Sequence, residues 1–275
     1  MQVASAPSLS GVKHVIAVAS GKGGVGKSTT TVNLALALAA EGARVGVLDA
    51  DIYGPSQGMM LGIDAGTRPQ PAGENSMLPV LANGLQAMSI SLLIDDNTPM
   101  VWRGPMAAGA LQQLITQTQW DNLDYLLIDM PPGTGDIQLT LAQKVAVDGA
   151  VIVTTPQDIA LLDAKKGIEM FRKVGIDVLG VVENMSTHIC SNCGHQESIF
   201  GAGGGERIAR DYDTELLGAL PLTLKIREQA DNGKPTVLAE PESDITAIYR
   251  SIARKIQEKI ATQTEQSPLI SVVED

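Results

Sequence analysis

The sequence predicts a doubly wound α/β fold, in which a mostly parallel sheet is flanked by helices on both faces to form a three-layer sandwich. A β-rich run at 12–20 leads through a glycine-rich loop into a helical pattern at 28–41. Further short apolar runs then alternate with helical stretches. Aromatic residues make up only 3% of a chain that is 44% hydrophobic, as expected where aliphatic side chains fill the layers around a buried parallel sheet.

The first unit is a strand, a loop and a helix, and Gly42 is expected to end that helix. The other predicted strands, all short and apolar, are 44–49, 125–129, 150–155 and 178–183. The other predicted helices are 105–119, 136–145, 159–174 and 245–262. The stretch 64–84 is rich in Gly and Pro and lacks a clear period, so we expect an insertion of loops or small hairpins there.

The length of 275 residues suits one domain at 11–262, with a short N-terminal extension at 1–10 and a mobile tail at 263–275. The first ten residues are polar without a basic segment, and no apolar run approaches the roughly 20 residues of a membrane helix. We therefore expect a cytoplasmic protein without stable membrane association. The net charge of −11 argues against a broad nucleic-acid-binding surface.

The glycine loop satisfies two nucleotide-binding motifs. It reads Gly21, Lys22, Gly23, Gly24, Val25, Gly26, Lys27, Ser28. Gly21, Gly23 and Gly26 match the dinucleotide fingerprint, and Asp49 lies near the distance expected for its ribose-binding acid. The pair Lys27-Ser28 favours a P-loop instead, because ATP needs a cation for its β- and γ-phosphates and a hydroxyl for Mg²⁺.

The P-loop reading assigns roles to the loop. Backbone N–H groups from Gly23 to Lys27 and the start of the following helix, which includes Thr29, would bind phosphate oxygens. Lys22 is an additional cation, either solvated or a second phosphate contact that could reach a neighbouring subunit's nucleotide. We expect Lys27→Ala to abolish turnover and leave the fold intact, since the lysine is expected to stabilise charge rather than to pack.

Three carboxylates follow predicted strands. Asp129 ends the strand at 125–129, where a Walker B acid belongs, and the Pro- and Gly-rich loop 131–136 follows it. Asp49 and Asp51 end the second strand. Since the carboxyl ends of parallel strands share one edge, we expect Asp49, Asp129 and Ser28 to serve Mg²⁺ and Asp51 to orient the attacking water.

The only two cysteines, Cys190 and Cys193, lie in a polar loop at 185–198. Two thiolates at this spacing can bind one metal ion, but a zinc or iron–sulfur site needs four ligands. Three interpretations are open: a Cys₂His₂ zinc loop with His188 and His195, a redox disulfide, or four thiolates shared by two copies of the chain. An inert pair is the fourth alternative.

The segments GKGGVGKSTTTVNLA, LDADIYGPSQ, YLLIDMPPGTGD, VVENMS and CSNC together resemble the Mrp/ApbC family of iron–sulfur cluster carrier ATPases. The resemblance runs from about Gly11 to Ile260. Lys22 matches the signature lysine of the deviant Walker A group, which includes the Min and Par ATPases and the nitrogenase iron protein.

The resemblance implies a homodimer whose two CxxC pairs hold one bridging [4Fe-4S] cluster. The cluster would be delivered to apo iron–sulfur proteins in an ATP-dependent way, with a cluster-assembly scaffold as a further partner. It also implies that Lys22 reaches the partner's nucleotide, that Asn184 contacts the adenine, and that Pro221 lies nearby. We expect slow hydrolysis, because no arginine finger can be chosen from the sequence.

Two regulatory ATPases are the alternatives. A Min-type protein would use the C-terminal helix as an amphipathic membrane anchor, with Ile252, Ile256 and Ile260 on one side. We favour a docking helix, because no Trp or Phe accompanies them. A Par-type DNA-segregation ATPase is disfavoured by the net charge. In either alternative, the CxxC pair would be a zinc or redox site.

Overall fold

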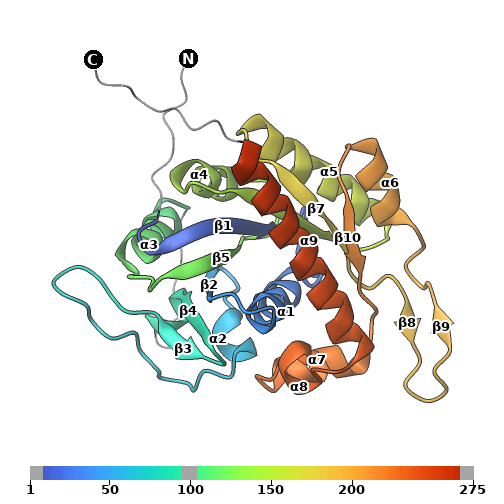
Figure 1. The fold of residues 1–275 in the computed structure, drawn as a ribbon, viewed down its shortest axis with the longest axis horizontal. Helices are drawn as coiled ribbons and strands as arrows, with labels where there is room; N and C mark the ends of the chain where they lie inside the picture. The colour runs from blue at the N-terminus through green and yellow to red at the C-terminus, as the bar shows by residue number, and fades with distance from the viewer. Residues whose placement is uncertain (1–8, 95–103, 267–275) are drawn as a thin grey trace.

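An eight-stranded sheet lies at the centre of the chain (Figure 1). The computed structural model describes residues 9–94 and 104–266. In spatial order the strands are β10 (Leu216–Ala219), β7 (Val178–Glu183), β6 (Gly149–Thr154), β1 (Val12–Ala19), β5 (Leu123–Asp129), β2 (Val45–Asp49), β4 (Leu85–Ser89) and β3 (Val80–Ala82). All neighbours are parallel except β3 and β4, which confirms the predicted fold class.

Helices cover both faces of this sheet. The longer ones are α1 (Lys27–Ala40), α3 (Gly104–Gln117), α4 (Asp136–Lys144), α5 (Asp158–Lys173) and α9 (Asp244–Gln266). The shorter ones are α2 (Gln57–Met60), the 3₁₀ helix η1 (Ile90–Leu92), α6 (Gly204–Asp211), α7 (Leu224–Asp231) and α8 (Thr236–Ala239). Alternate side chains of β1 separate the two layers. Val15 and Ala17 pack with α3, α4 and α5, whereas Ile16 and Val18 pack with α1 and α9.

The helix α9 packs on the sheet and on α1 (Figure 1). Ile252, Ile256 and Ile260 are all buried within the core cluster that includes α1. This stripe is therefore the docking face of the helix and is not free to insert into a membrane. None of the helices in the described ranges has the length and apolar character needed to cross one.

The predicted strands and helices are all present, with ends shifted by a few residues. The predicted insertion at 64–84 contains β3, which forms a hairpin with β4. Asn83 and Gly84, at its turn, have φ angles of 51° and 79°. The strands β4 and β10, the two-stranded sheet of β8 (His188–Ile189) and β9 (Gln196–Glu197), and the short helices were not predicted. The helix α9 continues to Gln266, and the rest of the predicted tail and residues 1–8 of the extension lie outside the described residues.

The winding of the chain brings four loops to one edge of the sheet. From β1 the chain passes to β2 and β4 on one side, whereas β6, β7 and β10 lie on the other. Ligands of doubly wound sheets bind at the carboxyl ends of the strands, near the point where the strand order reverses. The glycine loop follows β1, and Asp49, Asp129 and Asn184 lie at or after the ends of β2, β5 and β7.

Candidate functional site: a phosphate-binding loop beside a cysteine hairpin

The glycine loop joins β1 to α1, as predicted. Gly24 and Gly26 have φ angles of 79° and 83°, a conformation that favours glycine. A Cβ on Gly26 would lie 2.1 Å from Nδ2 of Asn184. A Cβ on Gly24 would meet open space: apart from its chain neighbours, no described atom lies within 4 Å. The loop thus presents its backbone to an open surface before the N-terminus of α1, an arrangement suited to phosphate binding.

Lys27 and Asp129, predicted to serve the phosphates and Mg²⁺, are in direct contact. Nζ of Lys27 lies 2.5 Å from Oδ1 of Asp129 and 3.2 Å from the Ser28 hydroxyl oxygen. Thr31 donates its hydroxyl to the same carboxylate oxygen at 3.2 Å. The start of α1 is therefore joined to the end of β5 by a charge-assisted hydrogen bond.

This buried contact corrects the expectation that Lys27 can be removed without effect on the fold. Both side chains are buried, and the carboxylate of Asp129 has no solvent exposure. Removing the lysine would leave that carboxylate buried without a counter-ion, which is strongly unfavourable. Lys27 therefore has a structural role as well as its predicted role toward phosphate.

Asp49 lies beside Asp129, because the two are register partners in the parallel strands β2 and β5. Its Oδ2 accepts the backbone N–H of Ser56 at 2.9 Å, that of Gln57 at 3.0 Å and the hydroxyl of Ser89 at 3.2 Å. Burial, and then the negative charge of Asp129, raise the pKa of Asp49 to about 7. The carboxylate therefore holds the loop after β2 against the site.

Asp51 is less enclosed than Asp49. It lies two residues beyond β2, is half-buried, and accepts the backbone N–H of Gly54 at 3.3 Å. Burial raises the pKa of Asp51, and the positive charge of Lys27 opposes that rise. A partly accessible carboxylate with a raised pKa is a suitable hydrogen-bond acceptor for a water molecule at this edge.

These residues fit a magnesium nucleotide. Ser28, Asp49 and Asp129 supply oxygen atoms, which Mg²⁺ prefers to nitrogen or sulfur. Oε1 of Gln57 is a buried acceptor without a hydrogen-bond partner among the described residues, and Mg²⁺ carries waters that would supply donors. The predicted phosphate, metal and water residues therefore meet at one edge of the sheet.

Two side chains of this site were missed from the sequence. Nε2 of Gln57 donates to Oδ2 of Asp129 at 2.8 Å and to the Ser28 carbonyl at 3.0 Å. Nε2 of Gln138 donates to the Pro132 carbonyl at 2.6 Å and so fixes the loop after β5. The side-chain partners of Gln57 are 72 and 29 residues away in sequence, so local spacing could not reveal them.

Asn184 and the Pro221 segment are neighbours beside the glycine loop. Nδ2 of Asn184 donates to the Val25 carbonyl at 2.8 Å. The backbone N–H of Leu220 donates to the Glu183 carbonyl at 2.8 Å, and that of Ser186 to the Leu220 carbonyl at 3.0 Å. The two segments that the resemblance assigns to the adenine therefore lie together. Their contact with adenine remains a prediction.

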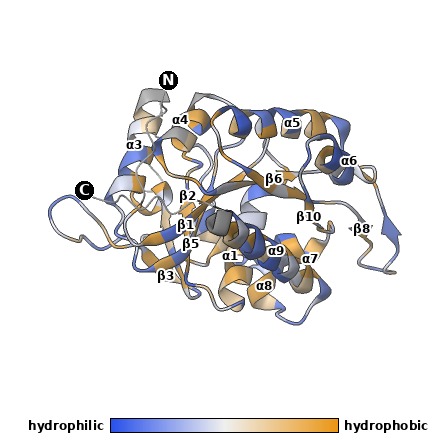
Figure 2. Cartoon of the chain, turned by 45° about the horizontal axis from the view of Figure 1, so that its top comes forward, coloured by the Kyte–Doolittle hydropathy of each residue, from blue (hydrophilic) through white to orange (hydrophobic). Residues whose placement is uncertain are grey.

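The cysteines lie on a hairpin formed by β8 (His188–Ile189) and β9 (Gln196–Glu197). This hairpin projects from the body and is largely hydrophilic (Figures 1 and 2). The backbone N–H of Cys190 donates to the His195 carbonyl at 2.9 Å. Cys190 is half-buried, Cys193 is exposed, and both thiols are free. Hydrogen bonds from the backbone N–H groups of Cys193 and then Asn192 lower the pKa of the Cys190 thiol.

The base of the hairpin is attached to the nucleotide edge. The backbone N–H of Leu222 donates to the Thr187 carbonyl at 2.8 Å, and that of Ile189 to the Leu222 carbonyl at 3.2 Å. Cys190 is only six residues from Asn184 in sequence. The segment between them is hydrogen-bonded to the loop that contains Pro221.

A zinc site within one chain is not present among the described residues. No group of three or more His, Cys, Asp or Glu side chains in residues 9–94 and 104–266 is arranged to hold a metal ion. The Cys₂His₂ interpretation with His188 and His195 therefore gains no support from the described residues of a single chain and stays a prediction.

Lys22 is half-buried in the glycine loop, and its carbonyl accepts the Ser20 hydroxyl at 2.9 Å. Within the described part of the chain, no hydrogen bond or ion pair joins its ammonium to another residue. The helix α5 packs directly against this loop, since a Cβ on Gly21 would lie 2.2 Å from backbone atoms of Asp163. The lysine is thus positioned at the surface of the loop, next to α5.

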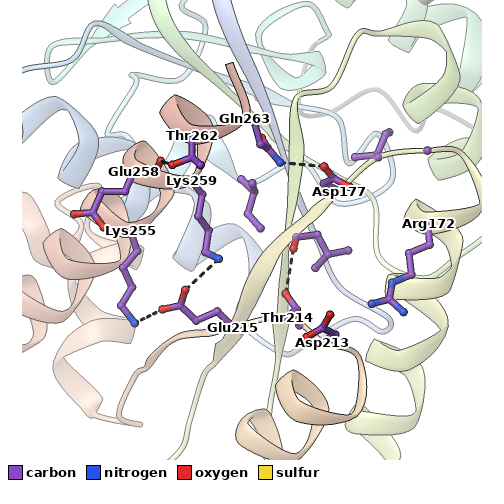
Figure 3. Close-up of a pocket in the computed structure, with 14 residues that line it drawn as sticks. Arg172, Asp177, Asp213, Thr214, Glu215, Lys255, Glu258, Lys259, Thr262 and Gln263 are labelled. Carbon is purple, nitrogen blue, oxygen red and sulfur yellow. Dashed lines mark hydrogen bonds and ion pairs between the residues drawn. The ribbon is translucent and has the colours of Figure 1, made fainter. Parts of the chain in front are cut away.

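A groove of about 670 Å³ lies elsewhere, where α9 crosses β7 and β10 (Figure 3). Glu215 occupies it, 2.8 Å from Nζ of Lys255 and 3.1 Å from Nζ of Lys259. Asp177 accepts a hydrogen bond from Gln263 at 3.1 Å on its other side. These groups pair with one another at the amino ends of the strands, away from the glycine loop.

Comparison with known proteins shows the family of this chain. Residues 11–257 match the ParA family model described as NUBPL iron-transfer P-loop NTPase. The iron–sulfur cluster carrier protein of Pseudomonas fragi is 68% identical over 91% of this chain and 87% of its own length. The iron–sulfur cluster carrier protein of Escherichia coli K12 is 60% identical over 97% of this chain and 72% of its own length. The mouse iron–sulfur cluster transfer protein NUBPL is 49% identical over 94% of this chain and 81% of its own length.

Solved structures show the same fold. A nucleotide-binding protein of Archaeoglobus fulgidus in complex with ADP is 39% identical, with a TM-score of 0.72 over 85% of this chain and 90% of that one. The Pyrococcus furiosus cell division ATPase MinD has a TM-score of 0.66 over 90% of this chain and 99% of its own. At 24% identity it shows the fold alone. The family model and the close relatives show that this chain belongs to the ParA family, as an iron-transfer P-loop NTPase of the NUBPL type.

Proposed function

We propose that the chain is an ATP-dependent iron–sulfur cluster carrier in which two copies hold one [4Fe-4S] cluster and pass it to apoproteins. The observation that carries the proposal is the hairpin: Cys190 and Cys193 are free thiols on a projecting loop whose base is hydrogen-bonded to the nucleotide edge. A [4Fe-4S] cluster is held by four thiolates. One chain supplies two, so two chains are needed.

In this proposal the glycine loop and the start of α1 bind the phosphates of ATP. Lys27 exchanges its contact with Asp129 for phosphate oxygens, and Ser28, Asp49 and Asp129 hold Mg²⁺ directly or through water. Bound Mg²⁺ would neutralise charge that develops on the phosphates during hydrolysis. Asp51 accepts a hydrogen bond from the attacking water.

In this proposal the adenine of the nucleotide lies beside the segment that follows β7. We propose that Asn184 and Pro221 contact the base. Support comes from the hydrogen bond between Asn184 and the Val25 carbonyl, which places the amide at the glycine loop. The short path from Asn184 to Cys190 gives nucleotide binding a direct mechanical connection to the thiols.

The second copy is proposed to face the glycine loop and α5. Ile159 and Leu162 are 60% and 52% exposed on α5, the helix whose backbone at Asp163 lies against Gly21 of the glycine loop. Exposed apolar side chains on this helix, together with a Lys22 ammonium that has no hydrogen-bond or ion-pair partner among the described residues, support a protein contact there. Lys22 would then reach the nucleotide of the partner subunit, and hydrolysis would be slow in the absence of an arginine finger.

Apo iron–sulfur proteins and a cluster-assembly scaffold are the proposed partners, and the cytoplasm is the proposed location. We propose no role in nucleic-acid binding, in line with the net charge of −11. The hairpin is also hydrophilic, as suits a surface that meets other proteins only transiently (Figure 2).

Anaerobic reconstitution with iron and sulfide tests the proposal. We expect about four iron and four sulfide ions per two chains, and loss of both in Cys190→Ala and Cys193→Ala. Ser191→Ala is the matched control, since Ser191 lies between the cysteines and should leave cluster binding intact. Tight zinc binding without iron uptake, or equal cluster content in the cysteine variants, would overturn the assignment.

A further inference from the structure

Gln57 connects the two buried carboxylates of the nucleotide site. It is the first residue of α2 and is 1% exposed. Its backbone N–H donates to Asp49 Oδ2 at 3.0 Å, and its side-chain Nε2 donates to Asp129 Oδ2 at 2.8 Å. The same nitrogen donates to the Ser28 carbonyl at 3.0 Å. One residue therefore touches all three of the predicted metal-binding residues.

The chemistry of these partners fixes the orientation of the amide. A carboxylate and a backbone carbonyl are both acceptors, so the nitrogen of the Gln57 amide must face them. Its Oε1 is left buried without a hydrogen-bond partner among the described residues. An unpaired buried acceptor is unfavourable and uncommon in folded proteins, so this one calls for a ligand that supplies a donor.

The side chain is not needed to fix α2. The backbone N–H groups of Ser56 and Gln57 already attach the start of that helix to Asp49. Asp129 already receives Lys27 and Thr31 on its other oxygen, Oδ1. An apolar side chain of similar volume would fill the same space and remove the unpaired Oε1, but it would leave Oδ2 of Asp129 without a donor. The amide therefore has a purpose that packing does not explain.

We propose that Gln57 is a positioning residue for the Mg²⁺ of the nucleotide site. Its Nε2 holds Oδ2 of Asp129, which keeps Oδ1 directed to the side where Lys27 and Ser28 lie. Its Oε1 accepts a hydrogen bond from a water molecule carried by Mg²⁺. Partners that orient metal ligands in this way commonly contribute 10- to 100-fold, on the order of one or two decades, to metal affinity. This inference rests on the proposed Mg²⁺–nucleotide site.

Binding of ADP, measured by titration calorimetry in Mg²⁺ and in EDTA, separates positioning from packing. Wild type should bind ADP more tightly with Mg²⁺. Gln57→Met keeps the volume and removes both polar atoms, so we expect it to reduce this Mg²⁺-dependent gain about 10-fold or more, with ADP affinity in EDTA nearly unchanged. Gln57→Asn keeps the amide but shortens its reach. It should give the same loss, and it serves as the test if the methionine variant does not fold.

Gln86→Met is the matched control. Gln86 also uses its amide, at 2.8 and 2.9 Å from backbone atoms of Asp121, but lies away from the nucleotide edge. It should retain the full Mg²⁺-dependent gain. An unchanged gain in the Gln57 variants, or an equal loss of affinity with and without Mg²⁺, would overturn the inference and leave the proposed function standing. A wild-type protein that binds no nucleotide would instead contradict the proposed function itself.

Discussion

Lys27 and Asp129 form a buried salt bridge between α1 and β5: Nζ lies 2.5 Å from Oδ1, and the side chains are 6% and 0% exposed. The lysine that is predicted to bind phosphate thus serves first as the counter-ion of the predicted Walker B carboxylate. Lys27 therefore contributes to the stability of the fold and is also part of the predicted nucleotide site.

Lys27→Ala is therefore expected to destabilise the protein as well as abolish turnover. Loss of the counter-ion of a buried carboxylate should lower the free energy of unfolding by about 3 kcal/mol, since Thr31 and Gln57 still donate to Asp129. Adding Asp129→Asn should restore most of that stability but no turnover. Urea denaturation at pH 7 measures the effect. If the Lys27→Ala protein unfolded at the same urea concentration as wild type, the salt bridge would contribute little to the free energy of unfolding.

Asp49 should make stability depend on pH. Its pKa is about 7 in the folded protein and near 3.8 when unperturbed, so the folded state binds the proton more tightly. The resulting stabilisation is fully present below pH 3.8 and is lost as the pH rises through 7. It amounts to at most about 4 kcal/mol.

Asp49→Asn isolates this contribution. Urea midpoints in EDTA at pH 5 and pH 8 should show a drop in wild type that the variant lacks, because asparagine does not titrate. Any constant cost of the substitution is the same at both pH values and cancels in the difference. Parallel pH profiles for the two proteins would contradict the raised pKa.

Gly26→Ala should abolish nucleotide binding. The residue has a φ angle of 83°, and its new Cβ would lie 2.1 Å from Nδ2 of Asn184. Gly42→Ala is the control, because Gly42 has a φ angle of 93° but open space around its Cβ position. Both variants should lose about 1 kcal/mol from the strained backbone, and only Gly26→Ala should lose ADP affinity by calorimetry. Equal ADP affinity in the two variants would contradict the close packing of Asn184 on the loop.

The Cys190 thiol should form its thiolate at a lower pH in the folded protein than an ordinary cysteine does. Hydrogen bonds from backbone N–H groups of the hairpin lower the pKa of Cys190. In the Cys193→Ser protein, which keeps only the Cys190 thiol, the rate of iodoacetamide alkylation followed against pH should have a lower midpoint when the protein is folded than when it is unfolded in urea. Coincident midpoints would mean that the hairpin does not favour the Cys190 thiolate.

Much of the fold could be predicted because its signals are local. The apolar strand at 12–20, the glycine loop and the following helix are contiguous, and the buried strands β5, β6 and β7 are strongly apolar. The strand β4 was missed, because Leu85–Ser89 includes a polar Gln and lies next to a Gly- and Pro-rich stretch. Its burial depends on pairing with β2, which local periodicity does not report.

The candidate site could be predicted where a motif has a fixed place in the fold. Asp129 follows an apolar strand, and Lys27 follows the glycine loop, so both were identified. The role of Gln57 depends on contacts with Asp129 and Ser28, which the fold brings together from distant positions. The structural role of Lys27 was missed for the same reason, since its partner is 102 residues away.

In the proposed carrier, two chains hold one cluster between their cysteine hairpins. Native mass spectrometry of the anaerobically reconstituted protein measures how many chains share one cluster. The proposal predicts a species with the mass of two chains plus one [4Fe-4S] cluster, absent when either Cys190 or Cys193 is replaced by alanine. A cluster bound to a single chain, or a dimer that carries zinc in place of iron and sulfide, would contradict it.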